Sequence, residues 1–377
     1  MAERLFSPDL LQAIAGKQYV LNERGFDILV KPIPDDERPG AMDPRLLKIT
    51  LPVTEGIKGF ILSLTTPIFV KSRSPRRITA FMRSHFMDIK SVPITADVTV
   101  RRGSVQTDET EVPIRIYRRA AGNDADKCEN LPVLFYIHGG GFAAGSPDIV
   151  EEMVKKIVSL SGCVAVQADY RLAPENPFPA SLNDCWEVLK WIYKNSREIN
   201  GDRKRICIAG DSAGGNLATV CAMRDRDEGA GMVKAQVLMY PVLNMAGKED
   251  DNYRWSLNEF KILKEHRKPI LFRINAMRPA GKGVLGCVLG AKDESQPYLS
   301  PYLGSLGGMP PCLILCGEFD SLRLDSEAYA RKLKAAGVMV RMVRYLGMAH
   351  AFAEWIGAQP QAEDCMAEIS RFMDEFV

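Results

Sequence analysis

The sequence predicts an α/β protein with a mostly parallel central sheet that helices cover on both faces. From about residue 94 onward, short apolar runs alternate with longer stretches of helical periodicity, which is the order of elements typical of parallel sheets. The chain has 377 residues, of which 46% are hydrophobic and 25% charged, so it can bury one large core. We therefore expect an α/β domain of about 250 to 300 residues with additions.

The expected strands form an edge pair and a central series. Residues 97–102 and 112–118 are separated by a polar turn, which favours an antiparallel hairpin at one edge of the sheet. The later, more apolar runs are typical of strands buried on both faces. They are 131–137, 163–168, 206–209, 235–240, 312–316 and 338–345. The helical patterns that alternate with them are 149–160, 181–195, 325–336 and 361–376.

Residues 1–90 and about 245–298 do not follow this alternation. The first region looks helical, and the second is polar, rich in Lys and Arg and interrupted by glycines. Because ligands of open α/β sheets bind at the carboxyl ends of the strands, we interpret both regions as parts of a mainly helical cap over that edge. The division is then a cap region at 1–90 and a main domain at 91–377 with a cap insertion at about 245–298. A separate N-terminal domain is the alternative.

Charge and cysteine usage exclude several classes of partner. The formal net charge is only +2 and no block of Lys and Arg stands out, so we expect no nucleic-acid partner. The nine cysteines are an odd set that lies mostly within apolar runs. This pattern favours buried free thiols and a reducing, cytoplasmic location. No pair has the spacing of metal ligands, so we expect no metal site.

No segment has the character of a membrane-spanning helix. The first residues include an early acid and no long apolar run, so we expect no secretory signal. The most apolar stretch, 51–70, contains Glu55, Lys58 and two prolines, and we interpret it as a partly buried helix or a lid segment. Contact with a lipid surface and formation of a homodimer are left open by the sequence.

The most informative stretch is Gly210-Asp211-Ser212-Ala213-Gly214. It lies where the strand pattern 206–209 turns into a helical pattern at 216–222, which is the context of a nucleophile elbow. In so tight a turn, flanking side chains would collide, so Gly210 and Gly214 would keep strand, turn and helix apart. Ser212 would then project from the sheet, with the N-terminus of the helix behind it.

A serine nucleophile needs a general base, and that base needs an acid to orient it. Of the four histidines, His350 follows the last predicted strand and so falls at the same edge of the sheet as Ser212. The acid should lie between serine and histidine if the order is Ser, acid, His. Asp320, just after the strand at 312–316, is the preferred candidate, and Glu318 is the alternative.

Acyl transfer also needs N–H donors for the oxyanion of the tetrahedral intermediate. The run His138-Gly139-Gly140-Gly141 follows a strand end, and such a run can turn its backbone N–H groups toward one point. An ordinary glycine-rich turn is the alternative, whereas a phosphate loop would require a Lys-Ser/Thr pair that is missing here. We expect His138 to hold the loop by side-chain hydrogen bonds.

These motifs together resemble the α/β-hydrolases related to hormone-sensitive lipase, which include many bacterial esterases and the arylacetamide deacetylases. The resemblance covers about residues 95–377. Its motifs are His138-Gly139-Gly140-Gly141-Phe142, Asp169-Tyr170-Arg171-Leu172-Ala173-Pro174-Glu175, Gly210-Asp211-Ser212-Ala213-Gly214, Asp320-Ser321-Leu322-Arg323 and His350-Ala351-Phe352. One departure is Ala351, which stands where the family usually has glycine.

The resemblance implies an α/β-hydrolase fold with Ser212 as nucleophile, His350 as base and Asp320 as orienting acid. It also implies an oxyanion hole made of the backbone N–H groups of Gly140, Gly141 and Ala213. Arg171 and Glu175 are expected in internal ion pairs.

The expected function is that of a serine carboxylesterase that acts on small-molecule esters with short to medium acyl chains. The reaction passes through an acyl-enzyme and requires no cofactor. An amidase or deacetylase with the same triad is the first alternative. A non-catalytic small-molecule receptor on the same fold is the second, and His350 argues against it.

Overall fold

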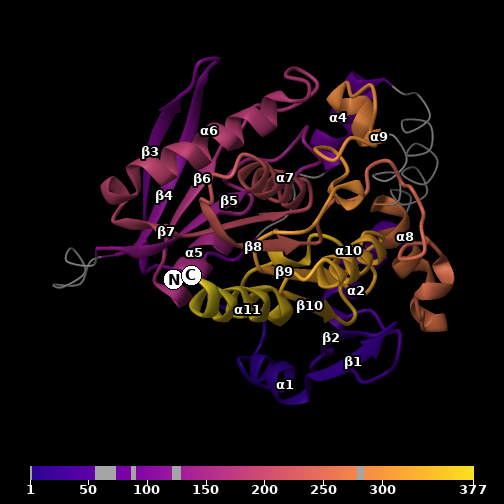
Figure 1. The fold of residues 1–377 in the computed structure, drawn as a ribbon. Coiled ribbons are helices and arrows are strands. Elements are labelled where there is room, and N and C mark those ends of the chain that lie inside the picture. Colours follow the sequence, from indigo (N-terminus) through magenta and orange to yellow (C-terminus); the bar gives the residue numbers. More distant parts are fainter. Residues whose placement is uncertain (1, 56–73, 86–90, 121–128, 278–283) are drawn as a thin grey trace.

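A sheet of ten strands crosses the molecule (Figure 1). The structure is a computed structural model that describes residues 2–55, 74–85, 91–120, 129–277 and 284–377. The strand order is β1-β2-β10-β9-β8-β7-β5-β6-β4-β3. The strands are β1 (Tyr19–Glu23), β2 (Phe26–Lys31), β3 (Val98–Gln106), β4 (Glu111–Arg119), β5 (Leu131–Ile137), β6 (Val164–Ala168), β7 (Gly201–Asp211), β8 (Val233–Met239), β9 (Cys312–Gly317) and β10 (Val340–Tyr345).

Helices lie on both faces of this sheet. The α-helices of the described residues are α1 (Asp9–Lys17), α2 (Pro44–Glu55), α4 (Pro75–His85), α5 (Glu151–Ser161), α6 (Ala180–Asn195), α7 (Ala213–Asp227), α8 (Arg267–Met277), α9 (Val284–Leu289), α10 (Arg323–Ala335) and α11 (Pro360–Phe376). Helices α5 and α11 pack into the hydrophobic cluster on one face. Helices α6, α7 and α10 pack into the cluster on the other face. The predicted α/β architecture is therefore confirmed.

The central strands are buried on both sides. Seven neighbours, from β2 to β6 in the sheet order, are parallel. Along β5, Val133 and Phe135 enter one core cluster while Leu134 and Tyr136 enter the other. Successive strand residues point to opposite faces, so an all-apolar run is what a parallel strand between two helical layers requires.

The predicted edge hairpin is also present. Strands β3 and β4 pair antiparallel, and β4 continues antiparallel onto β6. The strand expected at 206–209 is longer than predicted, because β7 begins at Gly201, where it pairs with Leu131 of β5.

The prediction that residues 1–90 precede the first strand and are helical is wrong for residues 19–31. Strand β2 joins the sheet parallel to β10, and β1 forms the outer edge. Phe26, Ile28 and Val30 alternate along β2 and are buried. The hairpin turn contains Arg24 and Gly25, with φ values of 51° and 73°, a geometry suited to the twist of a two-strand hairpin. The other elements described in this region are helices α1, α2 and α4.

Two further expectations meet the limits of the described chain. Of the apolar stretch 51–70, residues 51–55 belong to α2, and residues 56–70 lie outside the described residues. The buried cysteines that the structure describes are free thiols, as the sequence predicts, and Cys128 lies outside the described residues. No helix within the described ranges is long and apolar enough to cross a membrane.

Strand β2 should contribute to the stability of the whole sheet. We expect Ile28→Ala to lower the free energy of unfolding by about 2–5 kcal/mol, because it removes a fully buried side chain from the core. Urea denaturation followed by circular dichroism measures this. The control is Val20→Ala on β1, whose side chain is exposed. An unchanged midpoint for Ile28→Ala would show that β2 is not part of the cooperative unit.

Candidate active site

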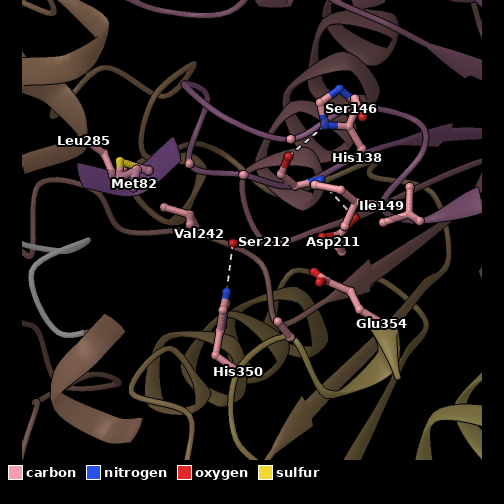
Figure 2. A pocket seen from close by; sticks show the side chains of 16 residues that line it. Met82, His138, Ser146, Ile149, Asp211, Ser212, Val242, Leu285, His350 and Glu354 are labelled. Carbon is pink, nitrogen blue, oxygen red and sulfur yellow. Dashed lines mark hydrogen bonds between the residues drawn. The ribbon is translucent and has the colours of Figure 1, made fainter. Parts of the chain in front are cut away.

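Four of the predicted site segments meet at the carboxyl edge of the sheet. Figure 2 shows Ser212, His138 and His350 from three of them. Ser212 follows β7, and the run that begins with His138 follows β5. Asp320 and His350 lie in the loops after β9 and β10. These four strands lie close together, with only β8 among them, in the order β10-β9-β8-β7-β5. Parallel pairing therefore brings segments distant in sequence to one place.

Ser212 occupies a tight turn between β7 and α7. Its φ and ψ are 53° and −116°, and its N–H donates to the carbonyl of Met239 at 2.9 Å. A Cβ atom at Gly210 would lie 2.4 Å from the carbonyl carbon of Gly214, and one at Gly214 would lie 2.1 Å from the carbonyl oxygen of Ile137. Both contacts are too close for any side chain, which explains glycine at both positions.

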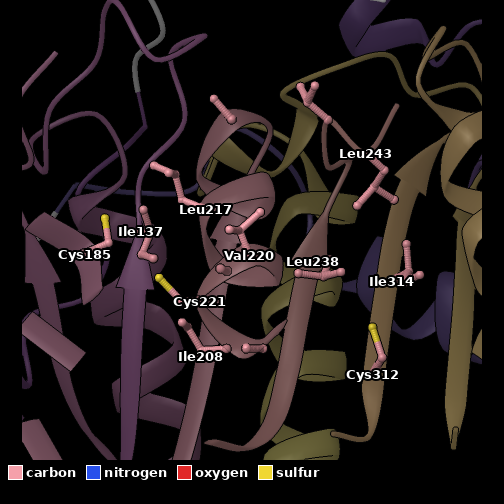
Figure 3. Packing of buried hydrophobic residues seen from close by; sticks show 14 of the residues in the cluster. Ile137, Cys185, Ile208, Leu217, Val220, Cys221, Leu238, Leu243, Cys312 and Ile314 are labelled. Carbon is pink, nitrogen blue, oxygen red and sulfur yellow. The ribbon is translucent and has the colours of Figure 1, made fainter. Parts of the chain in front are cut away.

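Helix α7 is held firmly behind this turn. Leu217 and Val220 on α7 pack against Ile208 of β7 and Leu238 of β8 in the hydrophobic core (Figure 3). Because these side chains are almost fully buried, the helix cannot shift without opening cavities in the core. The sheet and α7 therefore fix the position of the Ser212 backbone.

A chain of two hydrogen bonds joins Ser212, His350 and Asp320. His350 Nε2 lies 2.9 Å from Ser212 Oγ, and Nδ1 lies 2.7 Å from Asp320 Oδ2. An ionised carboxylate only accepts hydrogen bonds, so Nδ1–H donates to Asp320 and Nε2 accepts from the serine hydroxyl. This arrangement can remove the proton from Ser212.

The structure distinguishes the two acids that the sequence left open. Asp320 is fully buried, and its Oδ1 accepts from the backbone N–H of Leu322 at 2.9 Å. Glu318 instead accepts from the backbone N–H of Gly347 at 2.9 Å, and burial raises the pKa of its carboxyl. Asp320 thus contacts His350, whereas Glu318 fastens the loop that leads to it.

The glycine run lies beside Ser212 and is fastened by Asp211. The backbone N–H of Gly139 donates to Asp211 Oδ1 at 2.9 Å, and a Cβ atom at Gly139 would lie 2.2 Å from Asp211 Oδ2. Gly140 and Gly141 have φ values of 115° and 61°, which side chains rarely tolerate, and both line the cleft at Ser212. Ala213 is the first residue of α7, so its N–H has no partner within the helix.

His138 lies at the start of the glycine run, where its side chain contacts the backbone of that run. Its ring is buried, its Nδ1 lies 2.7 Å from the carbonyl oxygen of Gly139, and it stacks on Tyr170 with 4.3 Å between ring centroids. The hydroxyl of Tyr170 donates to the backbone carbonyl of His138 at 2.8 Å. Burial lowers the pKa of His138 to about 4, so the ring is neutral at physiological pH.

The cleft over Ser212 has two chemically different ends (Figure 2). Its empty volume is about 700 Å³, part of it open to solvent. One end is apolar and is lined by Met82 of α4, Val242 and Leu285 of α9. The opposite end includes Ile149 and the carboxyl groups of Asp211 and Glu354. Ser212 and His350 lie between the two ends.

Helix α4 is fastened over the glycine run by Arg83. The Arg83 Nε–H donates to the carbonyl oxygen of Ala143 at 2.8 Å, and Arg83 also pairs with Glu175 at 2.8 Å. Arg171 pairs with the buried Asp184 at 2.7 Å. The internal ion pair expected for Arg171 is therefore present, whereas the expectation is wrong for Glu175, whose ion pair with Arg83 is exposed to solvent.

Several residues of the site were not identified from the sequence. Met82 and Leu285 lie in the regions assigned to the cap, but no local pattern marks them as cleft residues. Tyr240, whose ring lies 4.9 Å from that of His350, directly follows β8. Its place at the end of a central strand was a usable signal. Glu354 follows His350 by four residues, and no motif marks it.

The fold and the site define an α/β-hydrolase. Residues 134–354 match the family model described as the alpha/beta hydrolase fold, and the chain belongs to this family. The likeness to the hormone-sensitive lipase group, inferred above from the motifs, is confirmed by the relatives.

Three of the similar proteins are esterases. The chain is 33% identical over 284 residues to carboxylesterase NlhH of Mycobacterium tuberculosis. This alignment covers 75% of the present chain and 84% of NlhH. It is 32% identical over 267 residues to the arylesterase of Saccharolobus solfataricus, and this alignment covers 70% of the present chain and 80% of the arylesterase. The solved esterase of Pyrobaculum calidifontis superposes with a TM-score of 0.65 at 30% identity and covers 89% of this chain and 98% of its own.

The loop that carries His350 contains one residue in an unfavourable conformation. Ala351 has φ 63° and ψ 22°, the left-handed region, which costs a residue with a Cβ atom roughly 1–2 kcal/mol. We expect Ala351→Gly to raise the free energy of unfolding by about 1 kcal/mol at most. The gain is limited because glycine loses more backbone entropy on folding than alanine does. Thermal and urea denaturation measure the change.

Ala336→Gly is the matched control, because Ala336 is exposed and has a φ of −84°. Glycine should lower stability at that position. A loss of stability in both variants would contradict the assignment of strain to Ala351.

Proposed function

We propose that Ser212, His350 and Asp320 are a catalytic triad and that the protein hydrolyses small-molecule carboxylic esters through an acyl-enzyme. The chain is a carboxylic ester hydrolase, like the relatives described above. The observation that carries the triad assignment is the pair of hydrogen bonds, 2.7 Å and 2.9 Å long, that link Asp320, His350 and Ser212. The tight turn that places Ser212 in the wall of the cleft supports it further.

In the proposed reaction, the ester carbonyl carbon lies next to Ser212 Oγ. His350 Nε2 takes the hydroxyl proton as Oγ attacks, and Asp320 stabilises the imidazolium through Nδ1–H. The tetrahedral intermediate collapses as His350 returns the proton to the departing alcohol oxygen. A water molecule, activated by the same nitrogen, then releases the carboxylic acid and restores the Ser212 hydroxyl.

The oxyanion would be bound by the backbone N–H groups of Gly140, Gly141 and Ala213. Both glycines line the cleft, and Ala213 is the first residue of α7. Donors fixed in place before the reaction stabilise a developing negative charge without reorganisation. Asp211 and His138, which hold the glycine run, would act through the positions of these groups.

The regions 1–90 and 245–298 are proposed to cap the catalytic domain at 91–377 and to favour short to medium acyl chains. Met82 and Leu285, one from each region, support this because both line the apolar end of the cleft. A Cβ atom at Gly141 would lie 2.3 Å from Met82 Cε. Met82 therefore lies against the glycine run and limits the space beside Ser212.

Serine-dependent turnover is the central test. We expect the wild type to hydrolyse p-nitrophenyl esters from acetate to octanoate faster than the laurate, and Ser212→Ala to lower kcat/KM by about 10⁴-fold or more. An organophosphonate should label the wild type and leave Ser212→Ala unlabelled. Release of p-nitrophenol and intact-mass spectrometry measure both. Equal rates of the two proteins would overturn the proposal, and faster turnover of matched p-nitroanilides would favour an amidase.

The role of the acid has its own test. Asp320→Asn should lower kcat by about 10³- to 10⁴-fold, because an amide at this position favours the wrong tautomer of His350. Glu318→Gln is the matched control, since glutamine retains an acceptor for the Gly347 N–H and should cost much less. Steady-state kinetics with p-nitrophenyl butyrate compares them. The reverse order of losses would assign the acid role to Glu318.

A further inference from the structure

Two buried carboxyl groups form part of the wall of the cleft at the end opposite Met82. Asp211 directly precedes Ser212, and Glu354 ends a short 3-10 helix (Phe352–Glu354) four residues after His350. Asp211 is 1% exposed and Glu354 is 7% exposed, yet both line the cleft. In Figure 2 the Glu354 carboxyl points toward Asp211.

The two carboxyl groups differ in their partners. Asp211 Oδ1 accepts from the Tyr136 hydroxyl and from the Gly139 N–H, each at 2.9 Å, so this side chain fastens the glycine run. Asp211 Oδ2 and Glu354 Oε2 are both buried and have no hydrogen-bond partner among the residues that the structure describes. A buried polar atom without a partner costs free energy, so Asp211 has a structural explanation that Glu354 lacks.

The backbone at Glu354 is held in place independently of its carboxyl group. The Ser91 hydroxyl donates to the backbone carbonyl oxygen of Glu354 at 2.6 Å. The backbone N–H of Val92 donates to the backbone carbonyl oxygen of Ile356 at 2.8 Å. The backbone of Glu354 is therefore fixed beside the cleft, and its side chain, which forms part of the cleft wall, has one oxygen without a partner among the described residues.

The charge around Glu354 favours a neutral partner. Among the described residues that line the cleft there is no Lys or Arg. Burial, and then the neighbouring Asp211, raise the pKa of Glu354 well above its ordinary value. Burial also raises the pKa of Asp211 to about 6. A carboxyl group at this position can accept a hydrogen bond from a hydroxyl group, and it can also donate one when it is protonated.

We propose that Glu354 is a specificity-determining residue that binds a hydroxyl group of the ester substrate at the end of the cleft opposite Met82. This inference rests on the proposed esterase function of Ser212. A site that hydrogen-bonds a substrate hydroxyl discriminates against an analogue without it, because the polar group of the site is then left unpaired. The hydroxyl can belong to the acyl part or to the alcohol part, according to which of them lies at that end.

Two pairs of matched esters test the proposal. One pair is p-nitrophenyl 3-hydroxybutyrate and p-nitrophenyl butyrate, and the other is 2-hydroxyethyl butyrate and ethyl butyrate. In at least one of the two pairs, the wild type should favour the hydroxylated ester by about tenfold or more in kcat/KM. One added hydrogen bond in a buried site would give a preference of this size. Acid release in a pH-stat measures the second pair.

The variants assign the preference to a residue. Glu354→Gln, which keeps a donor and an acceptor, should retain a preference for the hydroxylated ester, and Glu354→Leu should abolish or reverse it. Glu363→Gln is the matched control, because Glu363 is a buried glutamate that pairs with Arg4 away from the cleft, and it should leave the ratio unchanged. Organophosphonate titration measures the fraction of each variant with a reactive serine.

Two outcomes would overturn the proposal: no preference by the wild type in either pair, or a preference that survives Glu354→Leu. The wild-type ratios alone can reject it, and Glu354→Met is a second apolar variant if Glu354→Leu does not fold. Failure of the proposed esterase function gives a different result from failure of the Glu354 proposal. In that case the wild type would show no Ser212-dependent turnover of p-nitrophenyl butyrate or ethyl butyrate, the two esters without a hydroxyl group. Plain-ester turnover without a preference would reject only the role of Glu354.

Discussion

The backbone turn at Ser212 is the constraint on which the rest of the site depends. A residue with a side chain at φ 53° and ψ −116° is strained by about 1–3 kcal/mol, so the surroundings must hold it there. Strand β7 is paired on both sides and α7 is packed into the core. The same turn brings Gly214 against the carbonyl of Ile137, so the elbow and the glycine run share one rigid support.

Much of the site could be predicted because its components follow strands that are easily recognised. The apolar runs that became β5, β7, β9 and β10 are buried on both faces and have clear ends. Parallel strands place those ends at one edge of the sheet. The choice between Asp320 and Glu318 could not be made from order alone, because both follow β9 within three residues. It depends on loop geometry, which directs one carboxyl to His350 and the other to Gly347.

Two other features were not predicted from the sequence, the hairpin of β1 and β2 and the position of Met82 in the cleft. The hairpin of β1 and β2 had a usable signal in the alternation of Phe26, Ile28 and Val30 and in the turn at Gly25. The general helical appearance of the first 90 residues obscured that signal. Met82 offered none, because its place depends on how α4 packs against Gly141, a contact fastened by the bond from Arg83 to Ala143.

The cleft contains two buried carboxyl groups that stability alone would not select. Replacement of a buried charged group by an apolar side chain of similar size is often neutral or stabilising, and the two acids differ in this respect. Asp211 offsets its burial by fastening Gly139 and Tyr136, so its loss would free the glycine run. For Glu354, the Oε2 atom has no hydrogen-bond partner within the described residues. Such conflicts between stability and local environment are typical of functional sites. The two carboxyl groups make one end of the cleft polar, whereas the end near Met82 is apolar.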